Sequence, residues 1–493
     1  MTEKVLLKRN WILLALMLTM MLAAMDTTIV STAIPMIVAD LGGFNKFSWV
    51  FSIYLLAQTV TIPVYGKLSD TFGRKTILIT GIIIFLVGSA ASAASWNIGS
   101  LILFRGIQGL GAGSIMATVN TIAGDIYSVK ERAKIQGWLS SIWGISAIIG
   151  PALGGALAEY VDWRWIFLIN LPVGTLSIIL LIIHFKEKVK HEYSYIDYKG
   201  AVLILFTIGL FIIFLLEGGV SWPWISYPSV VIFIAVLVLA LFTFKIEKKA
   251  KNPIMPGWLW KNKTFAFTNL AMVAMGIVMM GPETFLPTFT QTSLSLGIIA
   301  SGFVLASMSI GWPTASALSG RLYLKIGFRN TSLIGTIIVI ISCAGFLLIP
   351  APQSIWLIVV DQVLLGVGFG LLSTPSLVGI QSIVSWQKRG VVTGANVFSR
   401  NLGQSLGASI FGAIFNASFI SQMKNAPGNL SVQNKNVLDM LHDPAISESS
   451  KKILRQAINI ATQHIYIGLS IFAIGTFLFI YLVPKNYKQL NTD

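Results

Sequence analysis

The series of long apolar runs constrains this chain more than any other feature. Fourteen stretches of about 20 residues follow one another almost without charge. A bilayer offers no water to backbone groups, so such segments satisfy their own hydrogen bonds by forming helices. The sequence therefore predicts an all-α membrane protein with 14 transmembrane helices. The runs lie near residues 11–35, 48–66, 76–96, 100–122, 136–158, 165–185, 200–219, 226–244, 264–288, 297–319, 330–350, 355–378, 391–418 and 461–483.

The composition excludes the main alternatives to a membrane protein. Charged residues make up 11% of the 493 residues, against about 25% in soluble domains, and hydrophobic residues make up 55%. A soluble enzyme and a disordered chain are both incompatible with this balance. A single cysteine, Cys343, also excludes a scaffold built on internal disulfides.

The basic residues predict the orientation. Lys and Arg gather before the first run and in alternate loops, whereas the short loops of the other face hold only Lys46 and Arg164. Positive charge marks the cytoplasmic face, and an even number of spans puts both termini on it. This topology explains the formal net charge of +16 without a nucleic-acid partner. We expect the first run to be retained rather than cleaved, since it continues past Asp26 to Pro35.

Two sequence patterns recur at nearly the same spacing. GKLSDTFGRK at 66–75 is similar to GRLYLKIGFR at 320–329, and GLGAG at 109–113 is similar to GVGFG at 366–370. Internal repeats in a membrane protein indicate a transporter of two halves, with the substrate site between them near the midplane. The predicted division is a six-helix half at 1–190, an inserted helix pair at 191–262 and a six-helix half at 263–493, the last with an extracellular loop at 419–460.

Four motifs carry a family resemblance over nearly the whole chain. They are LAAMDTTIVSTAIP (22–35), GKLSDTFGRK (66–75), LFRGIQGLGAG (103–113) and GISAIIGPALGG (144–155), each in or beside the expected span. Together they resemble the major facilitator superfamily, in its branch of 14-span drug:proton antiporters. The resemblance implies a multidrug efflux transporter that works by alternating access.

Three polar residues in the first half are candidates for binding a proton or a substrate. Asp26 lies near mid-bilayer, where an ionisable group costs at least about 2.5–3.5 kcal/mol and usually has a function. It could hold a proton, balance a cationic substrate, or only form a structural pair. Arg105 stays protonated, so it would tune a carboxylate, and the resemblance links it to proton coupling. Gln108 lies on the same helical face.

Two acids in the second half are further candidates for the same function. Glu283 lies toward the outer end of the ninth span, where it could face the cavity or reach the outer surface. Asp361 lies in the twelfth span and, with Gln362, occupies the place of Phe104 and Arg105 in the repeat.

The loop after the second span is a candidate gate. We expect Asp70 to pair with a basic group or a helix N-terminus, and to form with Arg74 a latch that breaks as the halves move. The second copy of the motif has Leu324 in place of Asp70, so that latch is expected to be incomplete. Arg400, in a polar stripe near the inner end of the thirteenth span, is a candidate gate or interfacial group.

The fifth span carries the motif that the resemblance associates with antiporters. Pro151 removes a backbone hydrogen bond, and Gly150, Gly154 and Gly155 permit close packing against a neighbouring helix. A close-packed helix at the interface of the halves could seal one side against leak. Simple packing would account for most of the same features.

The predicted function follows from what is present and absent. The chain has no G-x-x-x-x-G-K-[ST] phosphate loop, catalytic triad or metal-ligand spacing, so we expect no enzyme activity, metal or cofactor, and a proton gradient as the energy source. The acids favour export of amphipathic, cationic drugs or antiseptics. A lipid, fatty acid or other native metabolite is the alternative cargo. A channel or non-transporting sensor is disfavoured, because a pore needs a continuous polar lining.

The expected setting is a bacterial cytoplasmic membrane. The chain would cross it many times as a monomer, with protons, small-molecule drugs and membrane lipids as its partners and no nucleic acid.

Overall fold

The computed structural model describes residues 3–42, 46–187, 197–218, 221–349, 354–423 and 448–485. These residues form helices joined by short segments. In order the helices are α1 Glu3–Leu41, α2 Ser48–Phe72, α3 Arg74–Ala93, α4 Ile98–Ile126, α5 Val129–Tyr160, α6 Trp165–Leu168, α7 Asn170–His184, α8 Tyr198–Glu217, α9 Tyr227–Lys249, α10 Gly257–Lys261, α11 Lys263–Ser293, α12 Ile298–Ala306, α13 Met308–Ile326, α14 Phe328–Leu348, α15 Ile355–Ser382, η2 Trp386–Lys388, α16 Arg389–Met423 and α18 Glu448–Leu482.

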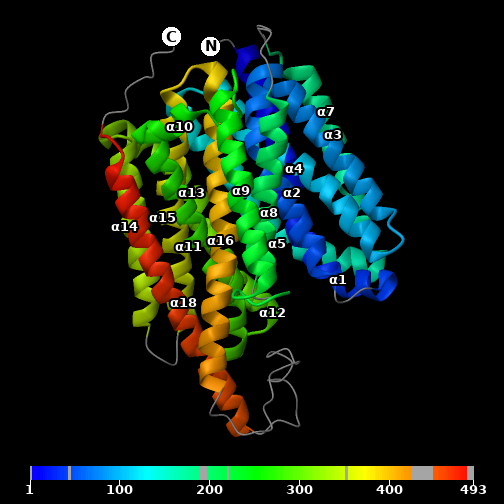
Figure 1. Ribbon diagram of the computed structural model, residues 1–493, viewed down its shortest axis with the longest axis vertical. Helices are drawn as coiled ribbons and strands as arrows, with labels where there is room; N and C mark the ends of the chain where they lie inside the picture. Colours follow the sequence, from blue (N-terminus) through cyan, green and yellow to red (C-terminus); the bar gives the residue numbers. More distant parts are fainter. Residues whose placement is uncertain are drawn as a thin grey trace.

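The long helices form two packed groups side by side (Figure 1). We call α1–α7 the first group and α11–α18 the second group. In the first, α4 packs against α2 and α3, and α1 against α5 and α7; in the second, α15 packs against α13 and α14, and α11 against α16 and α18. The groups meet along two seams, α2 with α16 and α5 with α13.

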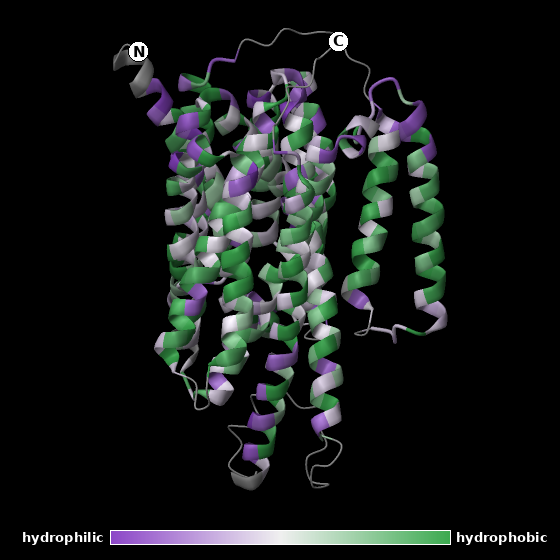
Figure 2. Ribbon diagram, turned by 90° about the vertical axis from the view of Figure 1, so that its left-hand side faces the viewer, coloured by the Kyte–Doolittle hydropathy of each residue, from purple (hydrophilic) through white to green (hydrophobic). Residues whose placement is uncertain are grey.

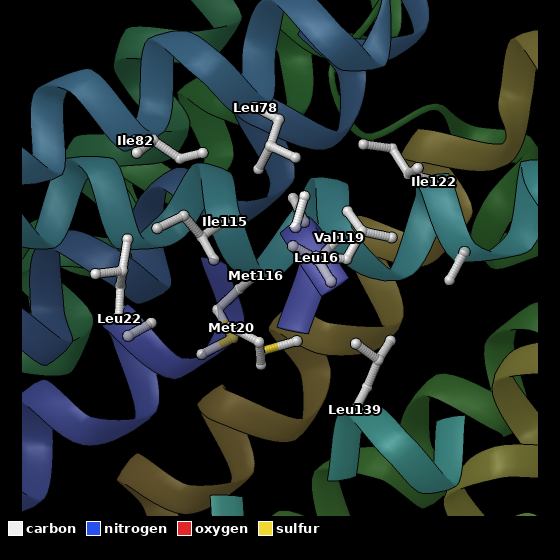
Figure 3. Close-up of a cluster of buried hydrophobic side chains, with 14 of the residues drawn as sticks. Leu16, Met20, Leu22, Leu78, Ile82, Ile115, Met116, Val119, Ile122 and Leu139 are labelled. Atoms are coloured by element: carbon white, nitrogen blue, oxygen red, sulfur yellow. The ribbon is translucent and has the colours of Figure 1, made fainter. Parts of the chain in front are cut away.

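Buried aliphatic side chains hold each group together. In the first group, α1, α3, α4 and α5 bring together Leu16, Leu78, Ile115 and Leu139, all almost fully buried (Figure 3). In the second group, α11, α15 and α18 contribute Met275, Phe369 and Leu469 to a separate core. Each group therefore has its own core, and Val397 and Phe398 of α16 also pack into the core of the first group.

The two copies of the repeated loop have the same backbone geometry. Gly73, between α2 and α3, has φ 92°, and Gly327, between α13 and α14, has φ 85°. Glycine adopts these left-handed values without the steric cost of a Cβ atom. Both loops lie at the end of the bundle where α1 begins and α18 ends, which we call the termini end.

Helices α8 and α9 stand outside the two groups (Figure 2). α8 contacts α2 and α16, and α9 contacts α8. Ser409 of α16 donates a hydrogen bond to the Leu215 carbonyl, 2.6 Å away. The pair thus lies beside the α2–α16 seam, and α9 exposes most of its apolar surface.

The described residues contain 13 helices long and apolar enough to span a membrane. The other predicted span, 297–319, coincides with α12 and α13, which are separated at Ser307. α12 has 9 residues, and α13 contains Pro313, Ser316 and Ser319 within its 19 residues. α12 is too short and α13 is too polar to count as a membrane span by length and apolarity. The count of 14 therefore stays a prediction. Most of the predicted loop at 419–460 lies outside the described residues.

Candidate functional site

The first group encloses a charged cluster built from α1 and α4. An Nη atom of Arg105 donates to an Asp26 carboxylate oxygen at 2.5 Å, and Gln108 donates to the other oxygen at 2.7 Å. Asp26, Arg105 and Gln108 are fully buried. α4 places Arg105 and Gln108 one helical turn apart, so both reach the same carboxylate.

Neighbouring groups fix the guanidinium of Arg105. Its Nε donates to the Val50 carbonyl at 3.2 Å, and its Cζ lies 4.2 Å from the centre of the Tyr54 ring. Gln108 and Asn170 both donate to the Ser89 hydroxyl. The cluster is therefore sealed within the first group and does not line the space between the groups.

Asp361 of the second group lies in a buried polar cluster of a different kind. Its carboxylate oxygens accept from the Ser342 hydroxyl at 2.9 Å and from the Gln362 amide at 3.1 Å. Among the described residues no Lys, Arg or His forms an ion pair with it. Gln362, which the sequence pattern aligns with Arg105, is an amide rather than a base.

Glu283 and Arg400 come from neighbouring helices of the second group, α11 and α16. Each acts electrostatically on the other, but they form no ion pair. Both are partly exposed, and the Nε of Arg400 has no hydrogen-bond partner in the described part of the chain. Arg400 is thus an intramembrane cation available to another group.

A cavity of about 50 Å³ lies between the two groups, with walls from α4, α5, α11, α13, α15 and α16. Asn120 and Gln136 line it from the first group, and Trp312, Asn396 and Arg400 from the second. Pockets for drug-sized ligands have about 300–1,000 Å³, so the groups would have to move apart to admit one. Arg400 is the one charged residue among those that line the cavity.

The α2–α16 seam is closed at the termini end by Asp70 and Arg74. Asp70 accepts from Arg74 at 2.6 Å and from the backbone N–H groups of Gly390 and Val391, at 2.8 and 2.9 Å, where α16 begins. Arg74 also lies over the Trp386 ring, 3.6 Å from its centre, and donates to the Trp386 carbonyl. The motif residues thus join the two groups.

Asp125 extends this contact. It pairs with Arg74 at 2.9 Å and with Arg389, which also donates to the Gly124 carbonyl. Neither Asp125 nor Arg389 was singled out from the sequence. Charged residues at the ends of apolar runs are common at solvated helix ends, so the sequence did not distinguish this pair from them.

The second seam, α5–α13, is closed at the same end by a neutral hydrogen bond, and its described residues form no ion pair between the two helices. Tyr323, which is almost fully buried, donates its hydroxyl hydrogen to the Val129 carbonyl at the start of α5. Leu324, the counterpart of Asp70, is 52% exposed and takes no part. The sequence did not predict this contact, because a single tyrosine at the end of an apolar run forms no distinctive pattern.

The glycines of α5 divide into two kinds. A Cβ atom at Gly150 would lie 2.0 Å from the Thr28 hydroxyl, and one at Gly154 would lie 2.4 Å from the Ile29 carbonyl, so both positions allow α1 to approach. Gly155 differs from the expectation of close packing, since no atom lies within 4 Å of its Cβ position. It points away from the α1 contact. Pro151 lies within the continuous helix.

The described residues contain no group of three His, Cys, Asp or Glu that could hold a metal ion. Comparison with known proteins assigns the sequence to a family. The sequence matches the Major Facilitator Superfamily over residues 16–408, from within α1 to within α16. The chain belongs to this superfamily. It is therefore a multi-pass membrane transporter rather than an enzyme.

Relatives of this superfamily transporter include efflux proteins. Multidrug resistance protein 3 of Bacillus subtilis is 34% identical over 404 residues, which cover 80% of this chain and 78% of the relative. The multidrug transporter protein MdtP of the same organism is 34% identical over 399 residues, 80% and 73% of the two chains. The MFS-type efflux pump LUC4 of a Fusarium species is 32% identical over 461 residues, 92% and 81%.

A solved structure has the same fold. The human organic anion transporter MFSD10 (TETRAN) aligns with a TM-score of 0.63 over 96% of this chain and 99% of its own, at 13% sequence identity. The similarity extends to both helix groups of this superfamily transporter and concerns the fold alone.

Proposed function

We propose that this transporter is a proton-coupled antiporter that exports amphipathic small molecules across the cytoplasmic membrane, with both termini in the cytoplasm. The cluster of Asp26, Arg105 and Gln108 carries the proposal. An acid and a base in contact, fully buried among membrane helices, form a group whose charge changes when a proton binds. Such intramembrane acids characterise proton pathways.

Protonation of Asp26 would loosen the contact between α1 and α4. The neutral carboxyl no longer balances the charge of Arg105, so the 2.5 Å ion pair loses most of its attraction. α1 also packs against α5, and α5 forms one of the two seams between the groups. A shift of α1 would therefore be transmitted to the α5–α13 seam.

The energy of a proton gradient suffices for steep export. Each charge that crosses 100 mV supplies about 2.3 kcal/mol. Each pH unit across the membrane supplies about 1.4 kcal/mol more. One or two protons per cycle would sustain a large concentration difference of the exported molecule.

The contacts at the termini end support an outward-facing assignment of this conformation. Asp70, Arg74 and Tyr323 close the cytoplasmic side in the proposed orientation, so cargo in this conformation would leave toward the outside. In the return step these contacts must break before cargo enters from the cytoplasm.

The names of relatives support two classes of cargo. Two Bacillus relatives are called multidrug proteins, which favours drugs. Another relative, 32% identical, is the acurin A biosynthesis cluster MFS-type transporter of Aspergillus aculeatus. That name supports the second candidate, export of a native metabolite by the same mechanism.

Proton exchange in everted membrane vesicles tests the proposal. Fluoroquinolones, ethidium and quaternary ammonium compounds would be added singly to vesicles with an acidic interior and a pH-sensitive dye. We expect dequenching by some compounds with the wild type, and none with Asp26→Asn. Asp40→Asn is the matched control, because Asp40 lies on the same helix but is exposed and pairs with Arg164. Undiminished exchange in Asp26→Asn would contradict the proton role.

A further inference from the structure

The charge of the cavity wall points to the class of cargo. Among the residues that line the cavity, Arg400 is the one with a charge, and none is an acid. Asp26 is enclosed with Arg105, and Asp361 is held by Ser342 and Gln362. The cationic cargo expected from the sequence relied on Asp26 and Glu283 facing the cavity, and neither is among the residues that line it.

Arg400 also has unused hydrogen-bonding capacity. Its buried Nε has no partner, and its guanidinium makes no hydrogen bond or ion pair within the described part of the chain. The nearby acid, Glu283, acts on it only through space. A buried donor without an acceptor is costly, so the site favours a ligand that brings one.

The remaining wall suits an amphipathic, planar molecule. Trp312 and Met272 offer apolar contact, while Asn120, Gln136 and Asn396 offer amide groups. A guanidinium binds a carboxylate through two parallel N–H···O bonds, which a lysine ammonium cannot form.

We propose that Arg400 binds a carboxylate on the transported molecule, so that the preferred cargo is a zwitterionic or anionic amphipath rather than a simple cation. The proposal rests on the proposed export function. It assigns Arg400 a substrate-binding role in place of the gating role that its position in the sequence favoured.

Calorimetric binding to the purified full chain in detergent tests it. The probes are norfloxacin, which has a carboxylate on a planar ring system, and its methyl ester, which does not. We expect Arg400→Gln to weaken norfloxacin binding at least about tenfold, the equivalent of one charge-assisted contact, and to change ester binding little. Arg400→Lys should fall between the wild type and Arg400→Gln. Arg321→Gln, which removes an exposed charge from α13, is the matched control and should leave both probes unchanged.

Three results would overturn the proposal: equal weakening of acid and ester by Arg400→Gln, no weakening of either, or no norfloxacin binding by the wild type. The binding assay and the vesicle assay can fail independently of each other, so they separate the cargo site from the antiport mechanism. Arg400-dependent binding without proton exchange would keep this site and refute the antiport mechanism. Proton exchange driven equally by both probes in Arg400→Gln would support antiport and refute this site.

Discussion

The two helix groups treat their intramembrane charges differently. In the first group Asp26 and Arg105 are in contact at 2.5 Å and fully buried. In the second group Glu283 and Arg400 interact only through space, and Arg400 lines the cavity. A contact pair is well suited to respond to a proton, because protonation breaks it. A separated base is well suited to bind an external anion. From this difference we infer that the first group binds the proton and the second group binds the cargo.

Removal of each arginine in turn should distinguish the two groups most clearly. Arg105→Ala leaves Asp26 as an unpaired buried charge, which we expect to cost about 3–5 kcal/mol. Arg400→Ala removes no ion pair, so its effect on stability should be below about 1 kcal/mol. Thermal unfolding of the purified variants in detergent measures both. Equal loss of stability in the two variants would show that Arg400 is as structural as Arg105.

The two seams offer a smaller, sharper contrast. Asp70→Asn removes charge-assisted hydrogen bonds, each worth about 1.5–3 kcal/mol, whereas Tyr323→Phe removes one neutral bond of about 0.5–1.5 kcal/mol. Both variants should open the termini end, Asp70→Asn more than Tyr323→Phe.

Labelling of a single cysteine measures that opening. Cys343 is the only cysteine and is buried, so Cys343→Ala provides the background, and Ser140→Cys places a thiol at the cavity. An impermeant maleimide added to everted vesicles should react faster in both variants than in the background alone. A larger increase in Tyr323→Phe would mean that the α5–α13 seam, and not the charged one, holds the protein closed.

The sequence predicted the helical architecture well, because the physics of a bilayer acts on each segment separately. Length and apolarity decide whether a segment spans, and both can be read locally. The segment 297–319 is harder to recognise by these two properties, since its polar and small residues pack against α5 and α15. Packing of that kind is not visible in one sequence.

The candidate residues were recognisable because charges are rare in apolar runs, but their partners were not. Asp26 and Arg105 are 79 positions apart and their contact depends on how α1 crosses α4. The cavity residues Asn120, Gln136 and Trp312 were not singled out. For Asn120 and Gln136 the available signal was an amide within an apolar run, whereas Trp312 and Tyr323 gave none.

Proton release on cargo binding tests the division of labour most directly. Purified protein in weakly buffered detergent solution would be mixed with norfloxacin, with a pH indicator to count protons and calorimetry to measure binding. The account predicts that the wild type binds and releases protons, Asp26→Asn binds but releases none, and Arg400→Gln binds weakly. Loss of binding in Asp26→Asn, with normal binding and proton release in Arg400→Gln, would contradict it.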